Sequence, residues 1–538
     1  MDNGPASPQP GQPSGMVIAT EAKGGSHRQA QLLRAGFRIP GAVDLILVLA
    51  VQAVLTIRLL RADTAFQDEA AYLWAGHLEW AHWLHGMTIP QFASYFSGAP
   101  VIYPPLAATA DSIGGLVAAR VLSLLFMLGA TALAWNVARR LFGRRAAFFA
   151  AILFAISGPA LHLGSFATYD AMALFLVAVA AQLVVLAGER QDASRLMIAA
   201  GVVLAIANAT SYSTAVDDVV VVLLALFTAI PRPGAKLGAG RSLILLGVTA
   251  VLATGGLLIG GSTYAHGVDV TTLERVSGSN STTEVLSDAW SWTGIIVVLA
   301  VIGLVISWLS REHGARPWLL GLFTVAALLA PAEQAGLHYV GSLNKHVGVG
   351  IWFAVMAGGY AVDRIIAAAP AGSARTVTCG ACVIALAFPL ALGVRQSRQF
   401  ATEWPDSNAF IDILGPWLAR TTGPILIEDP APAEYYLHQE SEWKRWSSTR
   451  NIVLYSGAST GGPSRTAGVV GQGDPAAFAR FIAAGYFSLV ALNFTDTTQL
   501  DHDIAADMKK SGSYHVVSVV PYGPDGGTYI IWRYEPRL

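Results

Sequence analysis

The sequence predicts a polytopic α-helical membrane protein with a small α/β domain at the C-terminal end. Of 538 residues, 54% are hydrophobic and only 13% are charged, and the mean hydropathy is +0.50. Soluble domains carry about 25% charged residues, so water is not the solvent for most of this surface. The apolar residues also collect in runs of about twenty, the length of a helix that crosses a bilayer.

Eleven apolar runs are separated by polar or Gly/Pro-rich breaks, and each is predicted to be a spanning helix. They lie near 42–60, 115–137, 146–161, 168–187, 196–212, 215–230, 242–260, 291–309, 318–332, 346–366 and 377–394. This gives a transmembrane domain at 41–395 with a long first outer loop at 61–114. The preceding residues 1–40 are rich in Pro, Gly, Ser and Gln, which predicts a disordered cytoplasmic tail.

Basic residues occur in every second connection between these runs, which predicts the orientation of the chain. They include Lys23, Arg28, Arg34, Arg38, Arg139, Arg140, Arg144, Arg145, Arg190, Arg195, Arg232, Lys236, Arg241, Arg311, Arg316, Arg364 and Arg375. Short cytoplasmic loops carry an excess of Lys and Arg, so these connections and the N-terminus are predicted to be cytoplasmic. An odd number of spans then places the C-terminal domain outside the plasma membrane.

The C-terminal segment 396–538 changes to mixed polar sequence and is predicted to be an extracytoplasmic α/β domain. Strands are predicted at 423–429, 451–457, 486–494, 514–520 and 528–536, and helices at 407–420, 474–485 and 498–510.

The net charge of −1 argues against a nucleic-acid partner, since phosphate backbones are bound by clusters of Lys and Arg. Cys379 and Cys382 have the spacing of a redox or metal pair, but they lie in an apolar run. Small packing residues inside a spanning helix are the favoured interpretation.

The first outer loop contains a candidate catalytic pair at the start of a helix. Asp68 and Glu69 open the segment, and Trp74, Trp80 and Trp83 follow at spacings typical of a helix in the membrane interface. Adjacent carboxylates there can stabilise the helix N-terminus. A carboxylate that faces a cavity at the membrane surface can also deprotonate an acceptor hydroxyl. Both roles remain open from spacing alone.

Two later outer loops carry further ionisable groups at the edge of a span. His162, Tyr169 and Asp170 lie around the start of the fourth run, where ionisable side chains indicate function unless they cap the helix. Lys345, with its neighbours His338, Tyr339 and His346, precedes the tenth run. These groups suit a phosphate at the lipid boundary, although a lysine can also extend from a helix end toward the headgroups.

Three motifs, DEAAYLW, TYDAMALFL and HYVGSLNKHVGVG, resemble the GT-C superfamily, specifically glycosyltransferase family 39 of the bacterial, actinobacterial type. That family contains protein O-mannosyltransferases and lipid A aminoarabinose transferases. The resemblance implies that Asp68 is the catalytic base, with Glu69 beside it and Asp170 also in the active site. It implies that Lys345, His346 and Arg275 bind the donor phosphate. Expected substrate-lining residues are Tyr72, His162, Tyr169, His338 and Tyr339.

The expected function is transfer of a hexose or pentose from a polyprenyl-phosphate donor to a protein, lipid or cell-wall glycan, with inversion. No cofactor is assigned, and a divalent metal is left open, although no His/Asp cluster with ligand spacing supports one. Two alternatives remain: a transporter or flippase of lipid-linked substrates, and an inactive relative that only binds. Transporters usually show internal repeats, and none is found. The aminoarabinose enzymes carry a lysine-bearing first-loop pattern whose equivalent here is the uncharged segment 102–106, so the sugar stays open.

Overall fold

A computed structural model describes residues 43–190, 192–229, 235–273, 277–402, 404–437, 440–449, 452–453, 469–470, 475–522 and 527–536. Contacts divide the chain into two units, Met1–Asp44 and Leu45–Leu538. The structural features discussed below belong to the second unit. The predicted tail at 1–40 lies outside the described residues.

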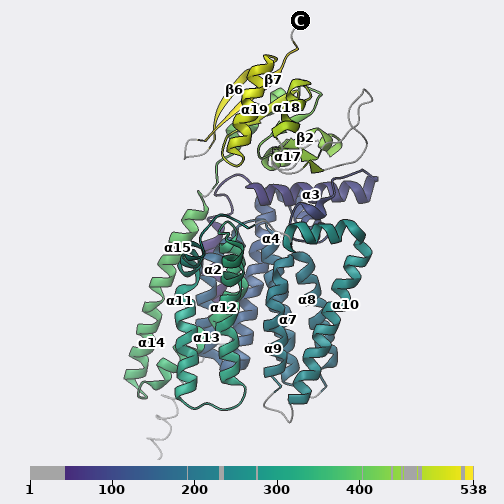
Figure 1. Ribbon diagram of the computed structural model, residues 1–538. Helices are drawn as coiled ribbons and strands as arrows, with labels where there is room; N and C mark the ends of the chain where they lie inside the picture. The colour runs from purple at the N-terminus through teal and green to yellow at the C-terminus, as the bar shows by residue number, and fades with distance from the viewer. Residues whose placement is uncertain are drawn as a thin grey trace, which may run out of the picture. The chain divides into compact units, whose positions relative to one another are not determined.

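The described chain up to Phe400 is almost entirely helical (Figure 1). Its helices are α2 (Val43–Ile57), α3 (Gln67–His85), α4 (Tyr103–Phe142), α5 (Arg144–Ala155), α6 (Gly158–Ser165), α7 (Tyr169–Gly188), α8 (Ser194–Thr210), α9 (Asp218–Phe227), α10 (Ala235–Val268), α11 (Thr282–Leu309), α12 (Arg316–Leu337), α13 (Leu343–Ala368), α14 (Ser373–Ala385) and α15 (Ala387–Phe400). Short turns of other helix types are η1 (Phe92–Ser94), η2 (Tyr212–Asp217) and η3 (Asp269–Leu273).

Within the described residues, seven helices are long and apolar enough to cross a membrane, or eight if the bent pair α5–α6 forms one span. Two shorter apolar helices, α2 and α8, accompany them. Every predicted run falls on helical elements, so the polytopic helical class is confirmed. The number of crossings remains a prediction.

Two predicted boundaries differ from the structure, and Gly and Pro explain both. The third run bends by 62° between α5 and α6, where Gly158 and Pro159 begin a new helix. Helix α4 already begins at Tyr103, inside the predicted first outer loop, with Pro104 and Pro105 in its first turn. The helix is interrupted at Gly115, whose φ of 65° suits a residue without a side chain.

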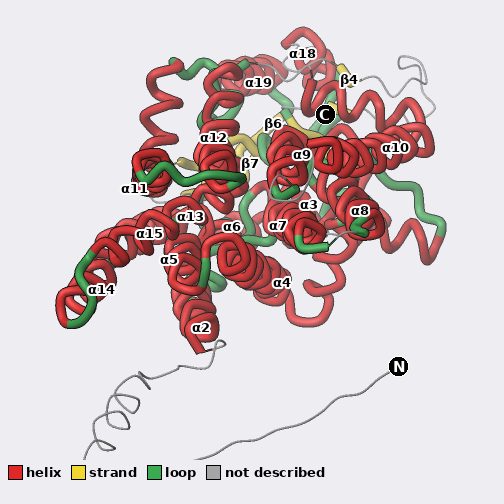
Figure 2. The backbone as a smooth tube through the Cα atoms, turned by 90° about the horizontal axis from the view of Figure 1, so that it is seen from below, coloured by secondary structure: helices red, strands yellow, loops and turns green. Residues whose placement is uncertain are grey.

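Helix α13 lies at the centre of the bundle, in contact with α5, α6, α7, α11 and α12 (Figure 2). Its glycines let neighbouring backbones approach closely. A Cβ at Gly350 or Gly359 would collide with the carbonyl oxygen of Ala326 or Ala146, respectively. Such small-residue packing is typical of helices in lipid, where the hydrophobic effect does not drive association. The start of α13, which carries Lys345, is thereby held in place.

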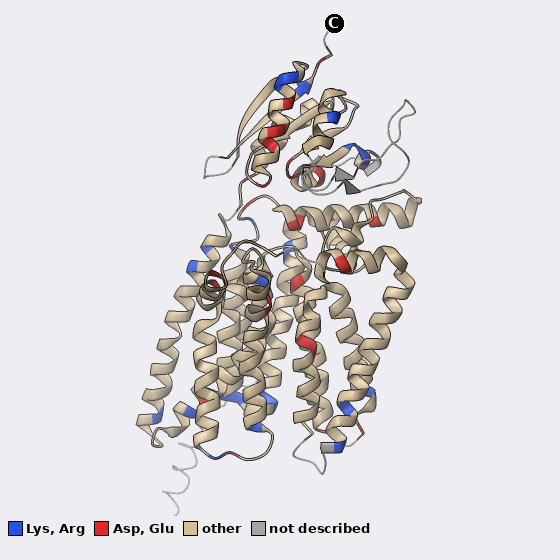
Figure 3. Cartoon of the chain, viewed as in Figure 1, with Lys and Arg blue, Asp and Glu red and all other residues tan. Residues whose placement is uncertain are grey.

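Those predicted basic connections that the structure describes lie at one end of the helices (Figure 3). Arg140 pairs with Glu189 at 2.7 Å, Arg145 pairs with Asp363 at 2.7 Å, and Arg241 donates to the carbonyl of Arg190 at 2.7 Å. Helix α3 crosses the opposite ends of the helices in Figure 1. Asp68 belongs to α3, and Lys345 pairs with it. The charge pattern therefore separates the two ends, while their assignment to the two sides of a membrane remains a prediction.

The C-terminal residues form a small α/β domain that begins with α16 (Asn408–Leu418). Helix α15 runs through the predicted boundary at 395 and ends at Phe400. A five-stranded sheet has the order β2-β1-β5-β7-β6, in which β1, β2 and β5 are parallel and β7 and β6 antiparallel. The strands are β1 (Ile425–Ile427), β2 (Trp446–Ser448), β5 (Leu489–Leu492), β6 (Tyr514–Tyr522) and β7 (Gly527–Tyr534), and β3 (Ile452–Val453) pairs with β4 (Val469–Val470). The other elements are α17 (Ala431–Tyr436), η4 (Glu440–Arg445), α18 (Pro475–Ala483) and α19 (Thr498–Ser511).

Candidate active site

Asp68 and Lys345, 277 positions apart in the sequence, form an ion pair of 2.5 Å. Asp68 lies in the first turn of α3, and Lys345 lies in the first turn of α13. The Lys345 side chain is 10% exposed and the Asp68 side chain is 36% exposed. The ammonium is therefore enclosed, while one face of the carboxylate remains accessible from outside the bundle.

Glu69 points away from this pair and binds Arg120 of α4. The guanidinium donates from Nε and Nη2 to the two carboxylate oxygens at 2.8 and 2.6 Å, and both side chains are buried. Arg120 also donates to the carbonyls of Leu60 and Asp63, and the Ala167 N–H donates to Glu69. This bidentate geometry fixes the start of α3 and thus the position of Asp68. A direct contact of Glu69 with reacting groups remains a prediction.

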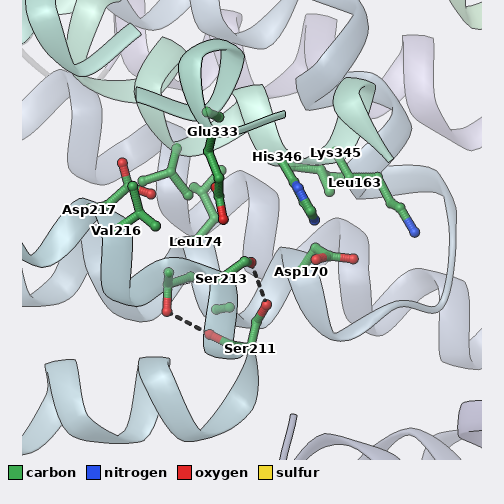
Figure 4. Close-up of a pocket in the computed structure, with 14 residues that line it drawn as sticks. Leu163, Asp170, Leu174, Ser211, Ser213, Val216, Asp217, Glu333, Lys345 and His346 are labelled. Atoms are coloured by element: carbon green, nitrogen blue, oxygen red, sulfur yellow. Dashed lines mark hydrogen bonds between the residues drawn. The ribbon is translucent and has the colours of Figure 1, made fainter. Parts of the chain in front are cut away.

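Asp170 and Lys345 line a common small cavity, which we call the Lys345 cavity (Figure 4). Its other polar lining residues are Ser211, Ser213, Thr214, Asp217, Glu333 and His346. The volume of about 20 Å³ is close to the space of one water molecule. Among the described residues, Oδ2 of Asp170 has no hydrogen-bond partner and is buried. The cavity therefore combines carboxylates with a lysine, but it is too narrow here for a phosphate.

His346 and the tyrosines also lie at this end of the bundle. Gln334 Nε2 donates to His346 Nδ1 at 2.7 Å, which orients the imidazole at the cavity wall. The rings of Tyr72 and Tyr169 are 4.7 Å apart, and Tyr72 also packs edge-on against Phe96. The structure thus brings together His346, Tyr72, Tyr169 and the Asp68–Lys345 pair.

Three other predicted residues lie elsewhere. His162 is buried between the rings of Phe166 and Phe400, at 4.9 and 4.4 Å, and does not line the Lys345 cavity. His338 donates from Nδ1 to the carbonyl of Asn280 at 3.0 Å, and neither it nor Tyr339 lines that cavity. Their contact with substrate therefore remains a prediction. Arg275 lies outside the described residues.

A second and larger cavity lies between α3 and the α/β domain, and we call it the α3 cavity. It has a volume of about 220 Å³. One wall comes from α3 and η1, and the other comes from the β1–α17 turn, η4 and β2; the lining residues are Gln67, Asp68, Ala71, Tyr72, Trp74, Pro90, Phe92, Tyr95, Phe96, Asp429, Pro430, Ala431, Glu434, Trp443, Trp446, Ser447 and Ser448. Asp68 thus lies in the wall of this cavity while it contacts Lys345 of the first one.

Hydrogen bonds join the C-terminal residues from Trp404 onward to the first outer loop and α4. Tyr435 donates to Asp111 at 2.7 Å and Trp443 to the carbonyl of Thr88 at 2.6 Å. The Ala65 N–H donates to the Tyr436 hydroxyl at 2.8 Å, and Trp404 donates to the carbonyl of Thr64 at 3.0 Å. The wall of the α3 cavity is therefore built from both parts of the chain.

Glu428 has a structural role in the α/β domain. Its carboxylate accepts the N–H groups of Asn493, Phe494, Thr495, Asp496 and Thr497 at 2.5–3.1 Å. These donors, and a hydrogen bond with Asp501, hold the Glu428 pKa below its ordinary value against the opposing effect of burial. Contacts within the chain thus account for the positions of Glu428, Tyr435 and Tyr436.

Sequence reasoning missed Arg120, Asp429, Glu434 and the burial of Asp217. A lone arginine inside the apolar run 115–137 is costly in a membrane, and that cost could have marked Arg120. Asp217 is buried in the wall of the Lys345 cavity. Nothing in local sequence marks Asp429 and Glu434, because their importance depends on the docking of the domain on α3. Among the described residues, no three His, Cys, Asp or Glu side chains lie close enough to hold a metal ion.

The fold of the chain is similar to that of several solved glycosyltransferase structures. ArnT from Cupriavidus metallidurans in the apo state matches with a TM-score of 0.56 at 16% identity, over 90% of this chain and 97% of that one. The same protein bound to undecaprenyl phosphate matches with a TM-score of 0.54 at 17% identity, with the same coverage. The oligosaccharyltransferase of Archaeoglobus fulgidus, in complex with Zn and sulfate, matches with a TM-score of 0.53 at 14% identity, over 90% of this chain and 72% of that one.

The sequence profile of the dolichyl-phosphate-mannose-protein mannosyltransferase family matches residues 107–254. No curated protein sequence matches the chain. The resemblance to GT-C glycosyltransferases of the protein mannosyltransferase type is thereby confirmed.

Proposed function

We propose that this chain is a membrane glycosyltransferase that moves one sugar from a polyprenyl monophosphate to an acceptor hydroxyl, with inversion at the anomeric carbon. The ion pair between Asp68 and Lys345 carries the proposal, because a carboxylate that can accept a proton lies next to an ammonium that can bind a phosphate. Two comparisons support a polyprenyl phosphate donor: ArnT binds undecaprenyl phosphate in one similar structure, and the matching family is named for dolichyl phosphate mannose.

In the proposed reaction the acceptor oxygen attacks the anomeric carbon from the side opposite the phosphate. The new C–O bond forms while the bond from carbon to the phosphate oxygen breaks, and this single displacement inverts the centre. Asp68 takes the acceptor proton, and the phosphate leaves with its negative charge next to the Lys345 ammonium. Little protonation of the leaving group is needed, since a phosphate is stable as an anion.

The donor and Asp68 compete for the same ammonium. Without donor, Lys345 neutralises Asp68 at 2.5 Å, and the Lys345 cavity is close to the size of one water. A phosphate that binds Lys345 would displace Asp68 and leave its carboxylate free to accept a proton. Donor binding would thus prepare the base.

The neighbouring residues have supporting roles in this proposal. Glu69 is a positioning residue, since Arg120 and the Ala167 N–H occupy its oxygens. Asp170 and His346 face the donor from the wall of the Lys345 cavity. The outer face of the plasma membrane, with a cytoplasmic N-terminus, is the proposed location, because the basic connections gather at the end opposite Asp68.

The test uses the full chain in lipid nanodiscs with a panel of radiolabelled polyprenyl-monophosphate sugars and a cell-envelope extract as acceptor. Asp68→Asn should reduce transfer by about 10²–10⁴-fold, the usual contribution of a general base. Asp412→Asn, a change of an exposed acid in α16, is the matched control and should transfer like the wild type. Transfer that survives in Asp68→Asn would exclude Asp68 as the base. Movement of lipid-linked sugar across vesicles without transfer would favour the transporter class.

A further inference from the structure

The α3 cavity has the composition of a binding site for a neutral sugar. Aromatic rings come from both walls: Trp74, Phe92 and Tyr95 on one side, and Trp443 and Trp446 on the other. A sugar ring presents a flat C–H face and a rim of hydroxyls. Such a ligand suits a pocket of apolar rings with a few fixed polar groups. The rings are rigid, so little conformational entropy is lost when they stack.

The polar groups of this cavity select against an anionic ligand. Asp429, Glu434, Gln67, Ser447 and Ser448 line it beside Asp68, and its described lining includes no Lys, Arg or His. Phosphate and carboxylate groups are bound in proteins chiefly by basic side chains and N–H groups. The charge of this wall therefore favours a neutral chain over a phospholipid headgroup.

Glu434 and Asp429 can act as a donor and an acceptor of hydrogen bonds. Burial, and then the nearby charge of Asp429, raise the pKa of Glu434 to about 8. A protonated Glu434 carries an O–H that can donate to a sugar oxygen, and the carboxylate of Asp429 can accept from a hydroxyl. Glu434 and Asp429, close together in the sequence, thus supply both the donor and the acceptor that the hydroxyl groups of a sugar need.

The location in the fold supports the same conclusion independently. Asp429 follows β1, and Ser447 and Ser448 end β2, so the cavity lies at the carboxyl ends of two adjacent parallel strands. Ligands of open α/β sheets bind in the crevice outside this edge. Here the crevice faces α3, so a ligand bound there would touch Asp68 in the opposite wall.

On the basis of the proposed function, we propose that the α3 cavity binds a neutral saccharide chain as the acceptor, so that the enzyme extends a glycan. A hydroxyl oxygen of that chain attacks the anomeric carbon of the donor sugar, whose bond to the phosphate oxygen breaks. The hydroxyl proton passes to Asp68, and the polyprenyl phosphate leaves. The α/β domain is thereby the acceptor-binding domain of this protein.

The experiment offers three acceptor classes to the full chain in nanodiscs with labelled polyprenyl-monophosphate sugars. The acceptors are neutral pentasaccharides of mannose, glucose, galactose or arabinose, peptides with Ser and Thr, and phospholipid vesicles. Asp68-dependent release of polyprenyl phosphate reports the donor reaction, and the fate of the label reports the acceptor. We expect a pentasaccharide to carry the label.

The variants locate the acceptor in the cavity. Tyr95→Ala and Glu434→Gln should each raise the acceptor KM about tenfold, which corresponds to about 1.4 kcal/mol of binding. Trp83→Ala is the control, because Trp83 is on α3, is as exposed as Tyr95 at 46%, and does not line the cavity. Donor binding by the same preparations identifies a misfolded variant.

The proposal would be overturned if peptide or lipid carried the label and no pentasaccharide did. It would also be overturned if Tyr95→Ala and Glu434→Gln had the same acceptor KM as Trp83→Ala. Asp68-dependent release in those cases would leave the proposed function intact. If no donor gives Asp68-dependent release, the proposed function itself fails.

Discussion

The ion pair of Asp68 and Lys345 leads to opposite predictions for its two members. Lys345→Met removes the cation that would hold the phosphate and should weaken binding of undecaprenyl phosphate at least tenfold, since a hydrogen bond to a charged group is worth about 1.5–3 kcal/mol. Asp68→Asn removes the competitor for that cation and should leave the affinity unchanged or increase it. Tryptophan fluorescence titrations in nanodiscs would measure both. A loss of affinity in Asp68→Asn would contradict the proposed exchange.

The buried pair of Glu69 and Arg120 predicts a loss of stability instead of a pure loss of chemistry. Glu69→Gln leaves the Arg120 charge buried without its bidentate partner. Breaking such a pair costs about 3–5 kcal/mol, so the thermal transition should fall by several degrees. Glu284→Gln, a change at an exposed helix start, should leave the transition in place. The double variant Glu69→Gln/Arg120→Met should recover part of the loss, and an unchanged transition in Glu69→Gln would refute the positioning role.

At the residue scale, the sequence indicated candidates by one criterion: an ionisable side chain at the end of an apolar run is costly in a membrane. Asp68, Asp170 and Lys345 were indicated in this way. The structure places Asp170 and Lys345 in the wall of the Lys345 cavity, and Asp68 contacts Lys345 from the wall of the α3 cavity. The same criterion indicated His162, which is buried between aromatic rings and whose contact with substrate remains a prediction. Residues distant in sequence determine whether a buried ionisable group faces a cavity or a packing contact, and a single sequence does not encode that choice visibly.

At the scale of elements, Asp501 in helix α19 predicts that the stability of the α/β domain depends on pH. Burial and the neighbouring Glu428 raise the pKa of Asp501 to about 8. A carboxyl whose pKa is higher in the folded state binds its proton more tightly there. It therefore contributes stability below its ordinary pKa of about 4, and that stability is lost as pH rises to about 8. Thermal unfolding in detergent should consequently show a lower transition at pH 9 than at pH 6.

The variant Asp501→Asn should reduce this difference, because an amide keeps hydrogen-bonding capacity without acquiring charge. Asp503→Asn is the matched control on the same helix, where Asp503 accepts from Gln499 at the surface at 3.2 Å. The idea is wrong if Asp501→Asn and Asp503→Asn shift with pH in the same way.

The helical elements were predictable because each apolar run has the length that lipid requires. The boundaries of the helices were less predictable. Helix α4 begins within the polar loop, with Pro104 and Pro105 in its first turn, whereas the apolar run begins only after Gly115. Strands β2 and β4 and helix α17 were missed, since segments of two to six residues have too little periodicity to detect.

At the scale of the whole molecule, the chemistry and the α/β domain occur at the same end of the helices. Tyr435, Trp443 and Tyr436 join the domain to the first outer loop and α4 close to Asp68. The predicted basic connections meet at the other end. The arrangement of loops by charge thus came from the sequence, whereas the closing of a cavity by the C-terminal domain came only from the structure.

This arrangement predicts which positions an impermeant thiol reagent reaches in intact cells. In a background in which Cys379 and Cys382 are changed to Ser, Lys509→Cys on the exposed face of α19 should be labelled from outside. His313→Cys, in the exposed connection between α11 and α12, should be labelled only after permeabilisation. The physical reason is the excess of Arg in that connection and its neighbours, since positive charge is retained on the cytoplasmic side. The reverse pattern would place Asp68, Lys345 and the α3 cavity on the cytoplasmic side, where an extracytoplasmic acceptor cannot reach them.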